Sequence, residues 1–147
     1  MTAIDTLTPQ PVEQQLSGFV KSARGLYYAW TVLFIAGVAL QVFFAGASLL
    51  VNSAYLEYHR VFAHILEGFA LLLPLFALVA RQPWRITLLS LLPFVLIAMQ
   101  YVFLWALTGM GLPLWTRGLH AVNALVIYWV MLRLSRSAWQ LWRAPTR

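Results

Sequence analysis

The stretch that decides the fold is Tyr27–Leu50, which reads YYAWTVLFIAGVALQVFFAGASLL. It lies inside a longer interval, from Arg24 to Glu57, that has no charged residue between its ends. About 20 consecutive apolar residues cross the hydrocarbon core of a bilayer as a helix, so this stretch predicts a transmembrane helix. The composition agrees, because 62% of the 147 residues are hydrophobic and only 10% are charged, whereas roughly a quarter of the residues in soluble domains are charged.

Three further apolar runs follow this stretch, and short polar segments separate them. Short connections join antiparallel neighbours, so the pattern predicts an all-α fold, an integral membrane four-helix up-down-up-down bundle over residues 25–134. The expected helices lie at about 27–50, 59–80, 86–107 and 115–134. An N-terminal cytoplasmic or interfacial segment (1–24) precedes the bundle, and a basic aromatic C-terminal tail (135–147) follows it. Pro74 and Pro93 are expected to kink the second and third helices, which bilayer helices tolerate.

The positive charges divide unevenly between the two ends of these helices. With both termini inside, the outer side carries only Arg60 and Arg117 of the ten Lys and Arg residues. The inner side carries Lys21, Arg24, Arg81, Arg85, Arg133, Arg136, Arg143 and Arg147. Cytoplasmic loops are the ones enriched in Lys and Arg. We therefore predict a multi-pass protein of the bacterial inner (cytoplasmic) membrane with both termini in the cytoplasm.

The composition also excludes whole classes of function. The chain has no cysteine, which rules out disulfides, iron–sulfur clusters, thiolate zinc and covalently attached c-type haem. The net charge of +6 is scattered along the chain without a recognition motif, so the expected partner is the lipid bilayer and not nucleic acid. No nucleophile–base pair, phosphate loop or metalloprotease motif is present. We therefore expect the chain to act as a subunit, and we do not expect it to be an enzyme by itself.

A few polar residues interrupt the apolar helices, and the alternation of helix direction puts all of them in the outer half of the bundle. Inside the helices they are Gln41, His64, Glu67, Gln100, His120 and Asn123, while His59, Arg60 and Arg117 stand at the outer mouths. Polar groups in hydrocarbon are unfavourable and usually face a partner or a site. The sequence therefore predicts one site to which all four helices contribute.

The second and fourth helices are diagonal in such a bundle, roughly 12–14 Å apart. That separation suits a b-type haem whose iron is held by His64 on one side and His120 on the other. Gly68 and Ala124, each one turn further along, are expected to leave room for the flat ring.

The remaining polar residues are assigned to the surroundings of this predicted haem. Arg60 and Arg117 lie about one turn toward water from the two histidines, and the guanidinium fork matches a haem propionate; the alternative is that they reach lipid phosphates. Gln41, Gln100 and Asn123 are candidates for the site and also for hydrogen bonds between helices.

Two other ligand classes fit the same residues. Glu67 or a histidine could relay protons to a quinone head group. Zinc or copper could be held if His59, His64, Glu67 and His120 converged. The metal hypothesis is the least favoured, because His59 and His64 are about 140° apart around a helix and cannot both point inward.

Three motifs carry a resemblance to known families: QVFFAG (41–46), EYHRVFAH (57–64) and LHAVNA (119–124), together with Gln100. Over roughly residues 27–134 the chain resembles a family of small bacterial four-helix membrane proteins of unknown function. A fainter resemblance, at Glu57, His59–Arg60 and His120, is to one four-helix half of haem A synthase. That resemblance implies a haem-ligating histidine on the second and fourth helices, and it leaves both His59 and His64 open as the ligand on the second.

The function predicted from these observations is binding of b-type haem by a small electron-transfer or redox subunit. The alternatives are a non-catalytic accessory or assembly subunit of a larger membrane complex, and a quinone-binding protein.

Overall fold

The computed structural model describes the backbone of residues 12–144 and the side chains of residues 18–144. Every regular element in this part of the chain is helical. The elements are α1 (Val12–Leu50), α2 (Tyr55–Val79), α3 (Trp84–Leu89), α4 (Leu92–Tyr101), the π-helix η1 (Val102–Ala106), α5 (Leu107–Gly109), the 3₁₀ helix η2 (Leu114–Gly118) and α6 (Leu119–Arg143). Four segments of the described chain are long and apolar enough to cross a membrane: Gly18–Leu50, Tyr55–Val79, Trp84–Gly109 and Leu114–Arg143. The protein is therefore an all-α, multi-pass membrane protein.

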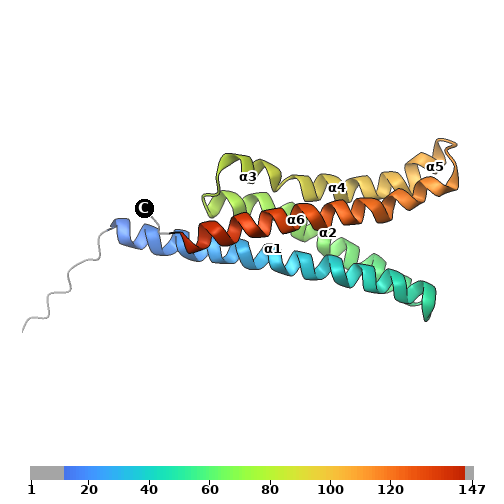
Figure 1. Ribbon diagram of the computed structural model, residues 1–147, viewed down its shortest axis with the longest axis horizontal. Coiled ribbons are helices and arrows are strands. Elements are labelled where there is room, and N and C mark those ends of the chain that lie inside the picture. Colours follow the sequence, from blue (N-terminus) through green and yellow to red (C-terminus); the bar gives the residue numbers. More distant parts are fainter. Residues whose placement is uncertain (1–11, 145–147) are drawn as a thin grey trace, which may run out of the picture.

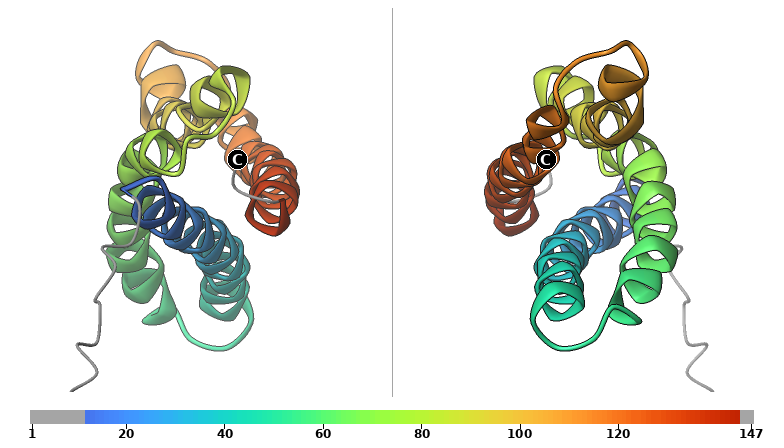
Figure 2. Two further views of the ribbon diagram at one scale, coloured as in Figure 1. Left: turned by 90° about the vertical axis from the view of Figure 1, so that its left-hand side faces the viewer. Right: turned by 90° about the vertical axis from the view of Figure 1, so that its right-hand side faces the viewer.

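The four spans lie along one long axis, and the chain turns back at alternate ends (Figure 1). α1 packs against both α2 and α6, and α4 packs against α6 and α2. Viewed along the axis, α2 and α6 lie on opposite sides of the bundle (Figure 2). The hairpin of α1 and α2 diverges from α4 and α6 toward the end that holds α5 (Figure 1). We call this the open end of the bundle, and the end that holds α3 the closed end.

Two helices extend beyond the predicted boundaries. α1 begins at Val12, so most of the predicted segment 1–24 continues the first span as helix, while residues 1–11 lie outside the described part. α6 continues to Arg143, through most of the predicted tail. There Trp139 and Trp142 pack against Tyr28 of α1, with ring centroids 5.0 and 5.6 Å away. The aromatic tail thus closes the bundle as part of its last helix.

The core follows one face of each long helix. Tyr27 and Phe34 of α1, Leu73 of α2, and Met131 and Leu134 of α6 are completely buried. Alanines complete this core at close contacts: Ala70, Ala77 and Ala80 of the second span and Ala138 of α6. Small residues allow membrane helices to approach closely, because packing contributes most of the attraction between helices in lipid.

The third span is interrupted near the closed end. α3 ends at Leu89, and Pro93 lies in the first turn of α4, where a proline needs no hydrogen bond from its nitrogen. The Ser90 hydroxyl donates to the Ile86 carbonyl oxygen at 2.8 Å and accepts a hydrogen bond from the Tyr27 hydroxyl at 2.7 Å. Ser90, at the interruption between α3 and α4, therefore connects the third span to α1 through the Tyr27 hydroxyl. Pro74, by contrast, lies inside α2, which continues through it to Val79.

Toward the open end the third span contains the π-helical turn η1. A π turn holds more residues than an α turn and is often found at functional sites. The chain then reverses through a loop in which Gly111 has a φ of 87°, a conformation that glycine adopts without strain.

Candidate functional site

Two histidines face each other inside the open half of the bundle. His59 of α2 and His120 of α6 have ring centroids 6.1 Å apart and ring planes at 62°. His59 lies seven residues before Leu66 and eleven before Ala70, which are both buried, so all three share the inward face of α2. The interior of the bundle therefore receives one imidazole from each of two opposite helices.

The hydrogen bond of His59 fixes which ring nitrogen is free. Its Nδ1 lies 3.1 Å from the backbone oxygen of Gln41 in α1. A carbonyl oxygen only accepts hydrogen bonds, so Nδ1 carries the proton and donates it. In a neutral imidazole the other nitrogen, Nε2, then has a free lone pair.

Three buried polar atoms near this pair have no hydrogen-bond partner among the described residues: His120 Nδ1, Gln41 Oε1 and Gln100 Oε1. Buried polar atoms are almost always hydrogen-bonded, so each exception needs an explanation. These atoms come from α6, α1 and α4. In the interior of the open half, three helices therefore each have a polar atom whose hydrogen bond is not formed with the described protein atoms.

Asn123 fixes the position of α4 relative to α6 along the bundle axis. Its side chain is only 6% exposed, and its Nδ2 donates to the backbone oxygen of Leu96 at 2.7 Å. This bond is the interhelical contact considered for it from the sequence. Because the two helices run in opposite directions, Gln100, one turn after Leu96, lies level with His120, about one turn before Asn123.

His64 lies on another face of α2, and the structure does not bring it to His120. Its side chain is 70% exposed, and its Nδ1 lies 3.4 Å from Glu67 Oε2. Gly68 is exposed on the same side, with nothing within 4 Å of the position of a Cβ. The reason is helical geometry: five residues separate His59 from His64, so the two rings point about 140° apart. The facing pair is thus His59 with His120, in place of the predicted His64 with His120.

The two outer arginines already have partners in the protein. Arg60 Nη1 lies 3.6 Å from Glu57 Oε2, an exposed ion pair on α2. Arg117 Nη2 donates to Thr108 Oγ1 at 3.3 Å, and its guanidinium lies 5.7 Å from the centre of the Trp105 ring. Arg117 therefore ties η2 to the end of the third span.

The metal hypothesis finds no geometric basis in the part of the chain that the structure describes. No group of three or more His, Cys, Asp or Glu side chains there is arranged to hold a metal ion. The separation of His59 from His64 and Glu67 explains this result, since His59 faces His120 of α6 while His64 and Glu67 lie on another face of α2.

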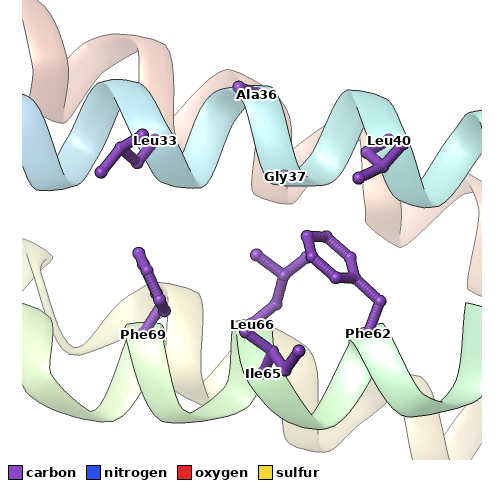
Figure 3. Close-up of a pocket in the computed structure, with 8 residues that line it drawn as sticks. All are labelled: Leu33, Ala36, Gly37, Leu40, Phe62, Ile65, Leu66 and Phe69. Atoms are coloured by element: carbon purple, nitrogen blue, oxygen red, sulfur yellow. The ribbon is translucent and has the colours of Figure 1, made fainter.

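A shallow apolar groove of about 270 Å³ runs along the outside of α1 and α2. Its lining is shown in Figure 3 and comprises Leu33, Ala36, Gly37, Leu40, Phe62, Ile65, Leu66 and Phe69. The lining has no ionisable side chain. The groove can therefore contact apolar chains, but it has no side chain that could act as an acid, a base or a metal ligand.

Sequence reasoning missed Tyr101, whose hydroxyl donates to Glu67 Oε2 at 3.4 Å. It follows Gln100, which was selected as an intramembrane polar residue. Tyrosine is common at the ends of membrane helices, so one more among six carried no distinct signal.

Comparison with known proteins gives one match. Residues 41–109 match DUF6220, a family of unknown function. The DUF6220 segment begins at Gln41 and ends at Gly109, so it contains His59, His64 and Glu67 but not His120. The predicted resemblance to a family of unknown function is therefore confirmed, and this family assigns no activity. No curated protein and no solved structure matches the chain.

Proposed function

We propose that this protein binds b-type haem in the open half of the bundle, where His59 and His120 would hold the iron, and that it serves as a small electron-transfer or redox subunit. The observation that supports this proposal is the facing imidazole pair at 6.1 Å. It uses one of the two histidines on α2 that the resemblance to haem A synthase leaves open, and the histidine on α6 that the sequence selects by depth.

The pair fits a haem iron in spacing and in protonation. A bond from a metal to an imidazole nitrogen is about 2 Å long, so two rings whose centres are 6.1 Å apart would be able to hold one metal ion between them. Ligating histidines usually donate their other ring N–H to a carbonyl or carboxylate, which fixes their orientation. His59 has such a bond to the Gln41 backbone oxygen.

The protein's own contribution is to hold and shield the group. A chain without cysteine binds haem only non-covalently, and the iron supplies one-electron redox chemistry when bound. The Gln41 carbonyl holds the His59 ring, and the Asn123–Leu96 bond holds α6 level with α4. Unpartnered Gln41 Oε1 and Gln100 Oε1 give the surroundings polar character.

The direct test is the optical spectrum of the full-length protein, produced with ample haem supply and purified in mild detergent. We expect a Soret band that shifts on reduction with dithionite, and one haem per chain by the pyridine haemochrome assay. A featureless visible region under these conditions would contradict haem binding. It would favour the alternative of a non-catalytic accessory or assembly subunit of a larger membrane complex.

We infer that the protein lies in the bacterial inner membrane with both termini in the cytoplasm. The described chain begins in α1 and ends in α6 at the same end of the molecule (Figure 1), and the sequence assigns seven of its nine Lys and Arg residues to that side. An alkaline phosphatase reporter fused after Arg147 should be inactive, while the same reporter inserted between Gly111 and Leu112 should be active. The reverse pattern would overturn this orientation.

Arg117 is expected to support the haem through its propionates, because it lies three residues before His120 and carries a guanidinium fork. Arg117→Gln should weaken haem retention about tenfold, the loss of one charge-assisted hydrogen bond of roughly 1.5 kcal/mol. The same change should lower the haem midpoint potential, because a nearby cation disfavours the oxidised iron. Haem transfer to apomyoglobin and a redox titration measure the two effects.

The matched control is Arg133→Gln. Arg133 also stacks on a tryptophan, with its guanidinium 5.4 Å from the Trp129 ring, but it lies more than three turns along α6 from His120. Arg60→Gln reports on the second outer arginine, which is paired with Glu57. Identical retention and potential in the Arg117 and Arg60 variants and the parent would assign both arginines to the lipid surface.

A further inference from the structure

A second polar feature lies on the outside of the bundle, separate from the facing histidines. Glu57, Arg60, His64 and Glu67 follow one another at helical spacing along the side of α2 that points away from the core. The inner end of this stripe is Glu67, about 10 Å along the helix from Arg60, which stands at the outer mouth of α2. Half the thickness of a hydrocarbon core is about 15 Å, so Glu67 lies inside the outer half of the hydrocarbon core.

The inner end of the stripe is a cluster of three side chains from two helices: His64 and Glu67 of α2 and Tyr101 of α4. Glu67 Oε2 lies 3.4 Å from His64 Nδ1 and 3.4 Å from the Tyr101 hydroxyl, which donates to it. The His64 side chain is 70% exposed and the Glu67 side chain 38% exposed. Ionisable groups at this depth normally face the interior of a bundle, whereas this cluster opens sideways toward lipid.

The hydrogen bonds give the cluster a defined outward-facing acceptor. When His64 Nδ1–H donates to the Glu67 carboxylate, Nε2 is the unprotonated ring nitrogen. Glu67 thus orients the imidazole and can take its proton. When Glu67 is protonated and donates to Nδ1, the tautomer reverses and Nε2–H becomes a donor. The same ring therefore offers an acceptor or a donor to a molecule in the lipid phase.

Beside this ring the helix surface leaves space. Gly68 is exposed, and nothing lies within 4 Å of where its Cβ would be. A flat ring can approach the backbone of α2 at Gly68 while its polar edge reaches His64, the residue one turn earlier.

We propose that the His64–Glu67–Tyr101 cluster binds the head group of a lipid-soluble hydroquinone or quinone that enters sideways from the bilayer. The depth selects this class: water-soluble ligands do not partition there, and the head groups of phospholipids and fatty acids stay at the interface. A hydroquinone hydroxyl donates to His64 Nε2 in one tautomer, and a quinone carbonyl accepts from it in the other. This site uses none of the residues of the proposed haem site and does not rest on haem binding.

The test is equilibrium binding to the full-length protein in phosphatidylcholine nanodiscs. Decylubiquinol, kept reduced under anaerobic conditions, and decylubiquinone are titrated by isothermal calorimetry against protein-containing and empty discs. We expect saturable binding by the parent. His64→Leu and Glu67→Gln should each raise the Kd about tenfold, as expected for loss of a hydrogen-bond partner of the ligand where no water replaces it. Tyr101→Phe should have a smaller effect, because it removes only a support of Glu67.

Two further variants keep the test decisive. Gly68→Val fills the space beside the ring without removing a polar atom and should also raise the Kd, even if the His64 variant fails to fold. Glu57→Gln changes the same stripe at its water end and should bind like the parent. The Soret band should be unchanged in His64→Leu, which separates this site from the haem proposal.

Equal affinity of the parent, His64→Leu and Gly68→Val would overturn the proposal, as would binding to the protein no greater than to empty discs. A dimer in discs that Glu67→Gln dissociates, with no binding of either probe, would assign this face to a second copy of the chain and would also overturn it.

Discussion

Replacing His59 or His120 by leucine is expected to remove haem from the purified protein, whereas replacing His64 leaves the haem content unchanged. The two residues whose rings face each other are the ones that can share an iron, while His64 points out of the bundle toward lipid. Haem per chain, by pyridine haemochrome assay, should fall from one to none in the His59 and His120 variants. Low-temperature electron paramagnetic resonance of the parent should show a low-spin ferric signal, as expected for two imidazole ligands.

Folding must be separated from ligation in this series. Each variant should elute as a single species in size-exclusion chromatography, and its helical content by circular dichroism should match that of the parent. Loss of haem in His64→Leu with retention in His59→Leu would restore the pair predicted from the sequence. It would require α2 to be rotated by more than a third of a turn from the structure described here.

The largest expected effect on stability comes from Gly37→Val. A Cβ at Gly37 would lie 2.6 Å from Leu66 Cδ2 and 3.5 Å from Phe62 Cε1, so a side chain here would meet the end of the Leu66 side chain, which extends from α2 toward α1 (Figure 3). Leu66 is buried, so its side chain must shift toward the adjoining groove to admit the added groups. Forcing extra groups into a packed contact destabilises a protein by about 1–3 kcal/mol. Thermal unfolding in detergent, followed by circular dichroism, should show a clearly lower midpoint.

Gly46→Val is the matched control, since it lies on the same helix and nothing occupies the space within 4 Å of its Cβ position. Both changes place a β-branched residue in α1, so effects on helix propensity cancel in the difference. A double variant, Gly37→Val with Leu66→Ala, should be less destabilised than the sum of the two single changes, because they share one contact. Equal midpoints for the Gly37 and Gly46 variants would contradict the close approach.

Hydropathy alone predicted the four spans but not where the helices end. Bilayer crossing requires an apolar run, and the sequence shows four of them. Nothing in lipid partitioning stops a helix once it reaches water, however, so α1 begins at Val12 and α6 reaches Arg143. The extension of α6 depends on contacts of Trp139 and Trp142 with Tyr28, which lie more than a hundred residues apart in the chain.

The position of the site was predictable, and the choice between its histidines was only partly so. Helix direction placed the six polar residues selected within the helices, from Gln41 to Asn123, at one end, and the geometry of α2 excluded two inward histidines. The spacing of His59, seven residues before Leu66, is in the sequence, but the structure is what shows that Leu66 faces the core. Equal depth favours His64 with His120, whereas the rotation of α2 favours His59. The role of Tyr101 depends on how α4 is placed beside α2, which no local pattern encodes.

The π-helical turn at Val102–Ala106 has the geometry of a single inserted residue. Each residue of an α-helix advances the chain by about 100°, so one additional residue in a turn changes the phase of everything that follows it. Gln100, before the turn, lies level with His120, and Trp105 and Thr108, within and after it, meet Arg117. A relative one residue shorter here would keep an unbroken helix and its hydropathy, yet it would present other side chains to that arginine. The length of this segment, as much as its composition, therefore sets the outer rim of the protein.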